Sequence, residues 1–269
     1  MGKKFLLIGT DKRQKYLLEY LKRRGHFAEL LDDIDKAVVD RYDAILLPVT
    51  DSKYYYEKIK DRLNKQQYVF GCNLEKKNNM EIAAAEAEQS ISHAKIIEYM
   101  GRKQTAIENA AATAEGAIAE AIINSDVNIC GGKSLVLGYG ICGRQIADRL
   151  AAMHSSVSVI ENDKILCAEA EARGFSVVDV GIAAHLQKTG KKYKFIFNTI
   201  PQIVLDKKVL SMLSLDITII DIASKPGGVD YEYCKSHNIR AVHALGLPGK
   251  YSPETSAEIL LNVIEKTML

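Results

Sequence analysis

The stretch at residues 133–163, KSLVLGYGICGRQIADRLAAMHSSVSVIEND, constrains the fold of this chain more than any other part of the sequence. A short apolar run at residues 134–137 is typical of a buried strand and leads directly into a G-x-G-x-x-G pattern. We expect a helix from about residue 144 to residue 153, and then a second strand at residues 157–160 that ends before Glu161. This order of strand, glycine turn, helix, strand and acidic residue is typical of a βαβ unit that binds a dinucleotide.

Each glycine of the turn has a physical role in such a unit. The first two permit a tight turn and let backbone N–H groups approach a pyrophosphate, and the third lets the helix pack closely on its strand. The helix N-terminus favours an anion, and an acid at the tip of the second strand hydrogen-bonds the ribose hydroxyls. A glycine turn can also be purely structural, but the complete pattern at this spacing favours a dinucleotide site. The predicted cofactor contacts are Gly138, Tyr139, Gly140, Ile141, Cys142, Gly143, Glu161 and Asn162.

Length and composition set the outer limits. The chain has 269 residues, 47% of them apolar, which is enough for a substantial core and suggests two domains. A formal net charge of +2 gives no overall signature of nucleic-acid or membrane binding, so local basic groups must hold any anionic substrate. The five cysteines form no Cys-x-x-Cys pair, which argues against a metal site and fits a cytoplasmic protein. We find no signal-peptide core and no window of transmembrane length.

Strands and helices alternate along the chain, which indicates parallel sheets. We predict an α/β protein of two Rossmann-like, doubly wound parallel-sheet domains separated by a cleft. The first, at residues 1–109, is expected to hold substrate or partner, and a connecting helix at residues 110–125 leads out of it. The dinucleotide-binding domain follows at residues 126–250. A C-terminal helix at residues 251–269 completes the chain and either packs back on the first domain or lies elsewhere.

Two local patterns refine this outline. The region at residues 76–100 is mostly helical in pattern, and a short strand at residues 105–107 is expected to complete the first sheet. Gly116 interrupts the alanine-rich connecting helix, which costs about 1 kcal/mol relative to alanine and indicates close packing or a bend.

Loops at the carboxyl ends of parallel strands build the sites of such sheets. Four loops of this kind are expected, at residues 9–14, 198–201, 223–230 and 246–250. Three of the five prolines lie in them, which indicates stiff loops that hold side chains in fixed positions. Further cofactor contacts are predicted from Asn198, Thr199 and Pro201.

These loops also carry a family resemblance. The segments are IGTDKRQ (8–14), AIENAAATAEG (106–116), NTIP (198–201), DIASKPGGVDY (221–231) and ALGLPGKYSPETSAEILLNV (244–263). Over essentially the whole chain the sequence resembles the family of dipicolinate synthase A subunits. The resemblance implies a dehydrogenase-like subunit in the mother-cell cytoplasm of a spore former, working with a smaller flavoprotein-type B subunit. It implies oxidation of a dihydro- or hydroxytetrahydro-dipicolinate to pyridine-2,6-dicarboxylate.

The resemblance and the local residues differ on the cofactor. Some members of the family follow the second glycine with arginine and place a basic residue after the second strand, as suits NADP. Here these positions are Ile141 and Glu161, and a carboxylate near the ribose would repel a 2′-phosphate. The residues favour NAD, whereas the family habit favours NADP.

The implied reaction removes a hydride and a proton from a ring with two carboxylates, so the site must orient the ring and bind both acidic groups. Arg13 and Lys225 are predicted as carboxylate-binding and catalytic residues, and Lys250 as a further substrate contact. Asp11 either orients Arg13, takes a proton or caps the first helix. No general base stands out, and His243 is interpreted as a core histidine or as that base.

Two other classes of function fit parts of the sequence. A non-catalytic NAD-binding regulatory or sensor module would bind a nucleotide without chemistry. An interaction scaffold with a relic glycine turn would bind none. Titration with NADH and NADPH, followed by an assay for reduced cofactor, distinguishes a dehydrogenase from a sensor module and from a scaffold. The sequence does not determine the oligomeric state, and a homodimer is one option because open-sheet dehydrogenases commonly pair.

Overall fold

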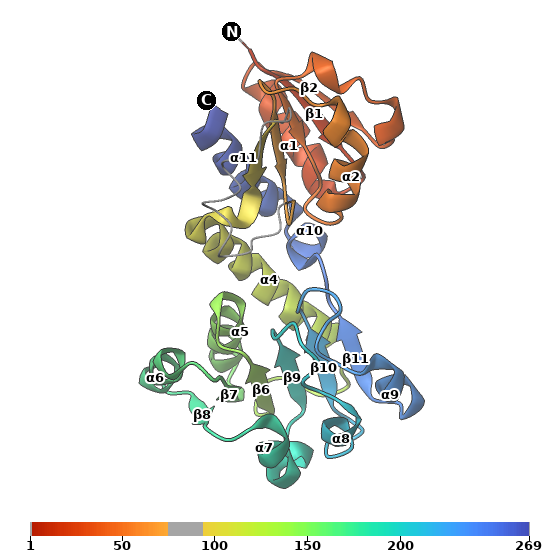
Figure 1. Cartoon of the computed structure of the whole chain (residues 1–269). Coiled ribbons are helices and arrows are strands. Elements are labelled where there is room, and N and C mark those ends of the chain that lie inside the picture. The colour runs from red at the N-terminus through yellow and green to blue at the C-terminus, as the bar shows by residue number, and fades with distance from the viewer. Residues whose placement is uncertain (1, 75–93, 269) are drawn as a thin grey trace, which may run out of the picture. The chain divides into compact units, whose positions relative to one another are not determined.

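Figure 1 shows the computed structural model of the chain, which describes residues 2–74 and 94–268. It divides into two compact units. Unit 1 comprises residues 1–109 and 252–269, and unit 2 comprises residues 110–251. Each unit contains one parallel sheet with helices on both faces, which confirms the predicted class of two doubly wound α/β domains.

The sheet of unit 1 has five parallel strands in the order β2-β1-β3-β4-β5. Phe5 and Leu7 point into a core shared with α1 and α11, and Leu6 and Ile8 point into a second core shared with α2. Burial on both faces explains why the first strand is apolar from Phe5 to Ile8, after the exposed Lys4. The elements are β1 (Lys4–Ile8), α1 (Lys12–Arg23), β2 (Phe27–Leu31), β3 (Ala44–Leu46), α2 (Ser52–Ile59), β4 (Tyr68–Gly71), β5 (Lys95–Glu98) and α11 (Pro253–Met268), with 3₁₀ turns at Ile34–Lys36, Val39–Arg41, Lys60–Arg62 and Tyr99–Gly101.

The sheet of unit 2 has six parallel strands in the order β11-β10-β9-β6-β7-β8. Val136 faces a core with α4 and α5, and its neighbours Leu135 and Leu137 face a core with α7, α8 and α9. The elements are α4 (Lys103–Ile123), β6 (Lys133–Leu137), α5 (Ile141–Ala152), β7 (Ser156–Ile160), α6 (Lys164–Ala172), β8 (Ser176–Val178), α7 (Ile182–Thr189), a 3₁₀ turn (Gly190–Lys192), β9 (Phe195–Asn198), α8 (Lys207–Leu210), β10 (Thr218–Asp221), α9 (Tyr231–Ser236), β11 (Arg240–His243) and α10 (Leu247–Tyr251).

Both sheets contain a switch point at which the strand order reverses. In unit 1 it lies between β1 and β3, and in unit 2 between β6 and β9. Ligands of open α/β sheets bind in the crevice at the carboxyl ends of the strands at such a point. The loop after β1 and the glycine turn after β6 therefore occupy equivalent places in the two units.

The edge strand of unit 1 was predicted wrongly. Residues 105–107 are helical, because α4 begins at Lys103 and its alanine-rich continuation favours a helix. The edge strand is β5, in a region predicted as helical, and it pairs in parallel with β4. The pairing of residues 95–98 with β4 makes them a strand, although the local sequence pattern favours a helix. The part of that helical prediction at residues 76–93 lies outside the described residues.

Two short helices were also missed. Residues 247–250, expected as part of a loop, belong to α10. Pro248 lies in the first turn of this helix, where a backbone N–H has no partner within the helix and its absence costs nothing. The helix α7 follows β8 without having been predicted.

The close packing expected at Gly116 is present, because a Cβ there would lie 2.8 Å from Cβ of Leu247. The helix α4 therefore approaches α10 closely and continues through the glycine.

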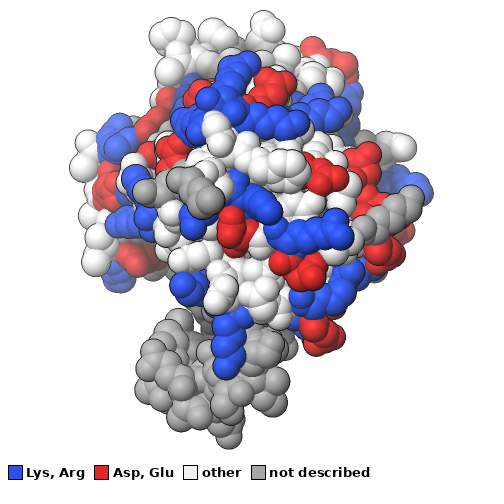
Figure 2. Space-filling view, turned by 90° about the horizontal axis from the view of Figure 1, so that it is seen from above, with Lys and Arg blue, Asp and Glu red and all other residues white. Residues whose placement is uncertain are grey.

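The surface has mixed charge on the face shown in Figure 2, where Lys and Arg side chains alternate with Asp and Glu side chains. This agrees with the small net charge of +2. Within the described parts of the chain, no helix is both long and apolar enough to cross a membrane.

Candidate functional site

The glycine turn (residues 138–143) joins β6 to α5. Gly138 has a left-handed φ of 85°, and Gly140 is the N-cap residue of α5. The helix therefore begins at Ile141, three residues earlier than predicted. No side chain among the described residues caps it, so amides of its first turn remain available to an anion.

The three glycines are required for different reasons. A Cβ at Gly143 would lie 2.0 Å from the carbonyl oxygen of Gly138, so this glycine is needed for helix packing. A Cβ at Gly138 would lie 2.3 Å from Oγ1 of Thr199. At Gly140 no described atom beyond the adjoining residues lies within 4 Å of the Cβ position. The open space in front of α5 therefore lies at Gly140.

Thr199 connects the glycine turn with the loop after β9. Its hydroxyl donates a hydrogen bond of 2.9 Å to the carbonyl oxygen of Leu137, the last residue of β6. Because β6 and β9 flank the switch point, this bond fixes both loops at the crevice. Pro201 lies farther along the same loop and is exposed.

Glu161 lies directly after β7 and binds the glycine turn. Its carboxylate accepts hydrogen bonds from the backbone N–H groups of Tyr139 (2.7 Å), Asn162 (2.7 Å) and Asp163 (3.0 Å). A carboxylate has about four acceptor positions, so it retains capacity for a hydroxyl donor. The predicted ribose contact is thus also a structural link between β7 and the turn.

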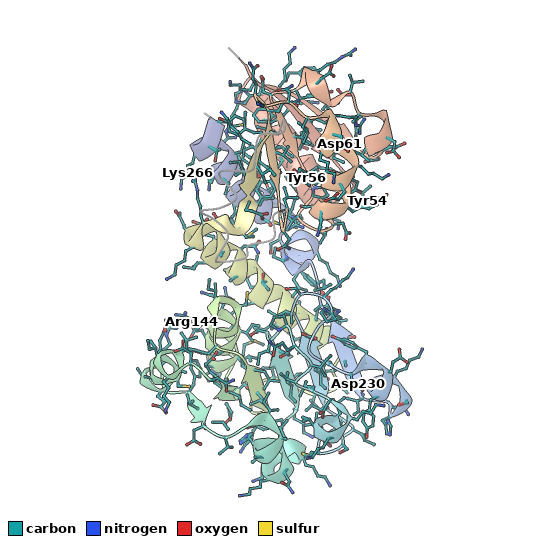
Figure 3. The ribbon with its side chains drawn as sticks, viewed as in Figure 1. Tyr54, Tyr56, Asp61, Arg144, Asp230 and Lys266 are labelled. Atoms are coloured by element: carbon teal, nitrogen blue, oxygen red, sulfur yellow. The ribbon has the colours of Figure 1, made fainter. Side chains whose placement is uncertain are left out.

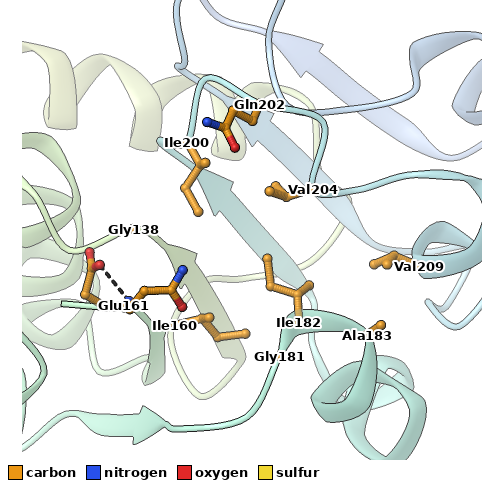
Figure 4. A pocket seen from close by; sticks show the side chains of 11 residues that line it. Gly138, Ile160, Glu161, Gly181, Ile182, Ala183, Ile200, Gln202, Val204 and Val209 are labelled. Carbon is orange, nitrogen blue, oxygen red and sulfur yellow. Dashed lines mark hydrogen bonds between the residues drawn. The ribbon is translucent and has the colours of Figure 1, made fainter. Parts of the chain in front are cut away.

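A pocket of about 520 Å³ opens between these loops. Figure 4 shows Ile182 and Ile200 reaching into it from different sides, with Gly138 and Glu161 at one end. The lining is mostly apolar, which suits a flat ring with a polar group at its edge. The lining residues are Gly138, Ile160, Glu161, Asn162, Gly181, Ile182, Ala183, Ile200, Gln202, Val204 and Val209.

Several residues predicted as cofactor contacts have structural roles. The side chain of Tyr139 is fully buried, packs edge-to-face on Phe175 at 5.9 Å, and has its pKa raised by burial. Only its backbone faces the turn. Ile141 and Cys142 lie partly buried in the first turn of α5, and burial raises the pKa of the Cys142 thiol. Arg144, labelled in Figure 3, forms an ion pair of 2.6 Å with Glu169.

Asn198 belongs to a buried polar network. Its amide group donates to Oδ1 of Asp221 (2.9 Å) and to the carbonyl oxygen of Ile200 (3.0 Å), so both amide hydrogens are used within the protein. Asp221 was not predicted and is fully buried. It also accepts hydrogen bonds from N–H of Ala223 (3.0 Å), N–H of Gly228 (2.7 Å) and the hydroxyl of Tyr231 (2.7 Å).

The network explains the shape of the loop at residues 223–230. Gly227 has a left-handed φ of 90°, and a Cβ at Gly228 would lie 2.3 Å from Nδ2 of Asn198. The loop is therefore wrapped closely around Asp221. Lys225 precedes Pro226 through a cis peptide bond, and its side chain is exposed. Asp230 ends the loop and caps α9 by accepting from N–H of Tyr233 (Figure 3).

On unit 1, Asp11 and Arg13 lie at the switch point after β1. Asp11 caps α1 by accepting from N–H of Arg13 at 3.0 Å, and its carboxylate also binds the Arg13 guanidinium through Nε and Nη2. Both side chains are largely buried, at 9% and 3% exposure. The capping and orienting roles considered for Asp11 are therefore both present. Nη1 of Arg13 carries no hydrogen bond to the described part of the chain.

Lys250 is held within unit 2. Its ammonium group pairs with the buried carboxylate of Glu120 at 2.5 Å, and the Tyr251 hydroxyl donates to the same oxygen at 3.0 Å. Hydrogen bonds from Lys250 and Tyr251 outweigh burial and lower the pKa of Glu120. The charge of Lys250 is therefore compensated.

In residues 2–74 and 94–268, no three His, Cys, Asp or Glu side chains gather in a way that would hold a metal ion.

Known proteins resemble this chain in both sequence and structure. A family model described as the TrkA-N domain matches residues 134–187. The dipicolinate synthase A subunit of Bacillus subtilis (strain 168) is 28% identical over 298 residues, covering 99% of this chain and 96% of the relative. The crystal structure of the dipicolinate synthase A subunit from Bacillus halodurans matches with a TM-score of 0.80 at 27% identity, covering 99% and 98% of the two chains.

A solved structure with lower sequence identity also shares the fold of this chain. The apo-structure of D-lactate dehydrogenase from Escherichia coli has a TM-score of 0.64 at 15% identity and covers 99% of this chain and 98% of its own. The comparisons confirm the resemblance to the dipicolinate synthase A subunits over the whole chain, and they show a dehydrogenase-like fold.

Proposed function

We propose that this chain is the dehydrogenase subunit of a dipicolinate synthase. It would oxidise dihydrodipicolinate, or its hydroxytetrahydro precursor, to pyridine-2,6-dicarboxylate with a nicotinamide dinucleotide. The observation that carries the proposal is the uncapped start of α5 beside Glu161 and a mostly apolar pocket, in a chain similar throughout to the dipicolinate synthase A subunits.

The residues of unit 2 fit a dinucleotide. The open space at Gly140 and the first-turn amides of α5 suit a pyrophosphate. The pocket between Ile182 and Ile200 suits the adenine ring, and Glu161 suits the adjacent ribose. When bound, the nicotinamide ring supplies the hydride acceptor. Of the predicted contacts, Asn162 lines the pocket, and Thr199 and Pro201 belong to the loop on its other side.

We propose NAD as the preferred cofactor. A 2′-phosphate on the ribose would bring its negative charge close to the carboxylate of Glu161. No arginine or lysine lines this pocket within the described residues, so the lining offers a phosphate no compensating charge. The carboxylate is also fixed by three backbone amides, which keeps it at the ribose position.

Glu161→Gln tests the cofactor preference. We expect the ratio of NADP to NAD affinity to rise by about tenfold, because the substitution removes the repelling charge and leaves one amide oxygen as acceptor. Fluorescence titration with NADH and NADPH measures both affinities. Glu171→Gln, on the exposed side of α6, is the matched control and should change neither value. An unchanged ratio in the Glu161 variant would contradict the proposed specificity.

Two basic residues are proposed to bind the substrate carboxylates. Lys225 is exposed at the end of β10 on a loop fixed by Asp221, and it has no ion-pair partner among residues 2–74 and 94–268. Asp11 orients the guanidinium of Arg13, on unit 1, and Nη1 of Arg13 has no hydrogen-bond partner among the described residues, so it is proposed to bind a carboxylate. Asp11 is therefore proposed as an orienting residue. We leave Lys250 out of the proposed site, because Glu120 already holds its ammonium group.

Lys225→Ala tests the substrate site. We expect kcat/KM for the dicarboxylate to fall by roughly tenfold, the loss typical of one hydrogen bond to a charged group, while the NADH affinity stays unchanged. Lys235→Ala, exposed on α9, is the control for removing a positive charge nearby in the sequence. A loss of cofactor affinity with normal substrate use would show that the loop serves the dinucleotide instead.

One assay tests the function as a whole. The purified chain is titrated with NADH and NADPH, and reduced cofactor is then followed with dihydrodipicolinate, with and without a flavoprotein-type B subunit. Turnover supports the proposal. Binding without turnover in the presence of that partner would favour a regulatory sensor, and no nucleotide binding would favour a scaffold. The proposal includes the cytoplasm of a sporulating mother cell as location and a homodimer as assembly.

A further inference from the structure

His243 lies in the same row of the sheet as the residues that build the site. In register, Leu137 of β6 is beside Asn198 of β9, Asn198 is beside Asp221 of β10, and Asp221 is beside His243 of β11. All four residues are the last of their strands. His243 is therefore at the carboxyl edge of the parallel sheet, where ligands of such sheets bind.

The hydrogen bond of His243 defines its tautomer. Nε2 lies 2.8 Å from the carbonyl oxygen of Ala223. A carbonyl oxygen only accepts, so Nε2 must carry the proton. In the neutral ring, Nδ1 is then unprotonated and has a lone pair available. The loop that carries Lys225 thus also selects the tautomer of neutral His243.

The surroundings of the ring leave Nδ1 without a partner. The Tyr231 ring is stacked on the imidazole at a centroid distance of 5.5 Å and an angle of 25°. The Cβ position of Gly227 lies 3.2 Å from Nε2 and 2.8 Å from Oδ2 of Asp221. Nδ1 makes no hydrogen bond within residues 2–74 and 94–268, and His243 is partly exposed.

We infer that His243 is the proton acceptor of the proposed oxidation, an inference that rests on the proposed function. Dihydrodipicolinate has two saturated ring positions. One loses a hydride, with both electrons of its C–H bond, to the oxidised nicotinamide dinucleotide. The other loses a proton to Nδ1 of His243, and the electron pair left behind completes the aromatic ring. The buried carboxylate of Asp221 lies against the same glycine and stabilises the resulting imidazolium.

The tautomer and the contact with the ring are tested by NMR, without turnover. In protein labelled with ¹⁵N-histidine, we expect Nε2 to be protonated and Nδ1 to be bare in neutral His243, with the resonances assigned from His243→Gln. Dipicolinate, added as the product, should shift the Nδ1 resonance of His243 and leave exposed His237 unchanged. A proton on Nδ1, or no shift at saturating dipicolinate, would overturn the inference.

Kinetics test the role itself. Glutamine can still donate to the Ala223 carbonyl but cannot take a proton, so His243→Gln should lower kcat by about 10²–10⁴-fold with unchanged NADH affinity. The larger loss in His243→Ala should be partly restored by added imidazole, which a structural role would not produce. If the wild-type chain catalyses the reaction and His243→Gln has the same kcat, the inference about His243 fails while the proposed function stands. If the wild-type chain with its partner does not turn over, the proposed function fails.

Discussion

Replacing Gly140 by valine is expected to weaken NADH binding by more than about 100-fold while changing the melting temperature by less than about 2 °C. The backbone at Gly140 has φ −68° and ψ −161°, an extended conformation with negative φ, so a side chain there carries no left-handed strain. Apart from Gly140 and its two neighbours in the chain, no described atom lies within 4 Å of its Cβ position, so we expect the fold to tolerate the side chain. The valine would instead fill the space in front of α5 that the pyrophosphate requires.

Gly143→Ala is the matched control for this prediction. Its Cβ would lie 2.0 Å from the carbonyl oxygen of Gly138, so the helix must shift. Overpacking of this kind costs about 3 kcal/mol, and the melting temperature should fall clearly. Fluorescence titration and thermal melts of both variants separate a glycine needed by a ligand from one needed by the fold. Normal NADH affinity in Gly140→Val would remove the dinucleotide site from the proposal.

The glycine turn was predictable because its signal is local. Strand, turn and helix follow one another in sequence, and each glycine has a steric role that a pattern expresses. The side chain of Tyr139 was not predictable in the same way. It turns back into the core against Phe175, which follows α6 and precedes β8. A residue inside a binding motif can thus belong to the core, and only the packing of distant elements decides which.

The polar groups at the ends of β9 and β10 show the same limit. The sequence places Asn198 directly after an apolar run and so marks it as a loop residue near a ligand. In the structure, Asp221 on the next strand uses its amide. An aspartate that ends an otherwise apolar strand was a signal for Asp221, but its partners lie at residues 198, 223, 228 and 231, which no local pattern connects. Strand order, which the sequence does not express, brings Asn198 to Asp221, and the folding of the following loop brings the other three.

The basic residues illustrate a further limit. Arg13, Lys225 and Lys250 have the same appearance in the sequence, as cations in loops after strands. The structure separates them by their partners. Arg13 is bound by Asp11, Lys250 by Glu120 from a helix 130 residues earlier, and Lys225 by no acid among the described residues. The pair of Arg13 and Asp11 is local, and it was considered from the sequence. The pairing of Lys250 with Glu120 depends on a tertiary contact, so it could not be predicted from sequence.

The second large effect is expected at Asp221. In Asp221→Ala, two buried backbone N–H groups, at Ala223 and Gly228, lose their acceptor, together with the hydroxyl of Tyr231 and the amide of Asn198. An unsatisfied buried donor costs about 1–3 kcal/mol, so we expect a loss of roughly 4 kcal/mol or more. The melting temperature of unit 2 should fall by on the order of 10 °C.

The consequence for function follows from the loop that Asp221 holds. Without its acceptor, the loop at residues 223–230 loses the bonds that fix Lys225 and the Ala223 carbonyl, so kcat/KM should fall further than in Lys225→Ala. Asp206→Ala, which removes one exposed helix cap at α8, should cost only about 1 kcal/mol and serves as control. Thermal melts and dicarboxylate kinetics of the two variants measure both effects. Equal melting temperatures would mean that the network does not hold the loop, and the placement of Lys225 and His243 at one site would lose its physical basis.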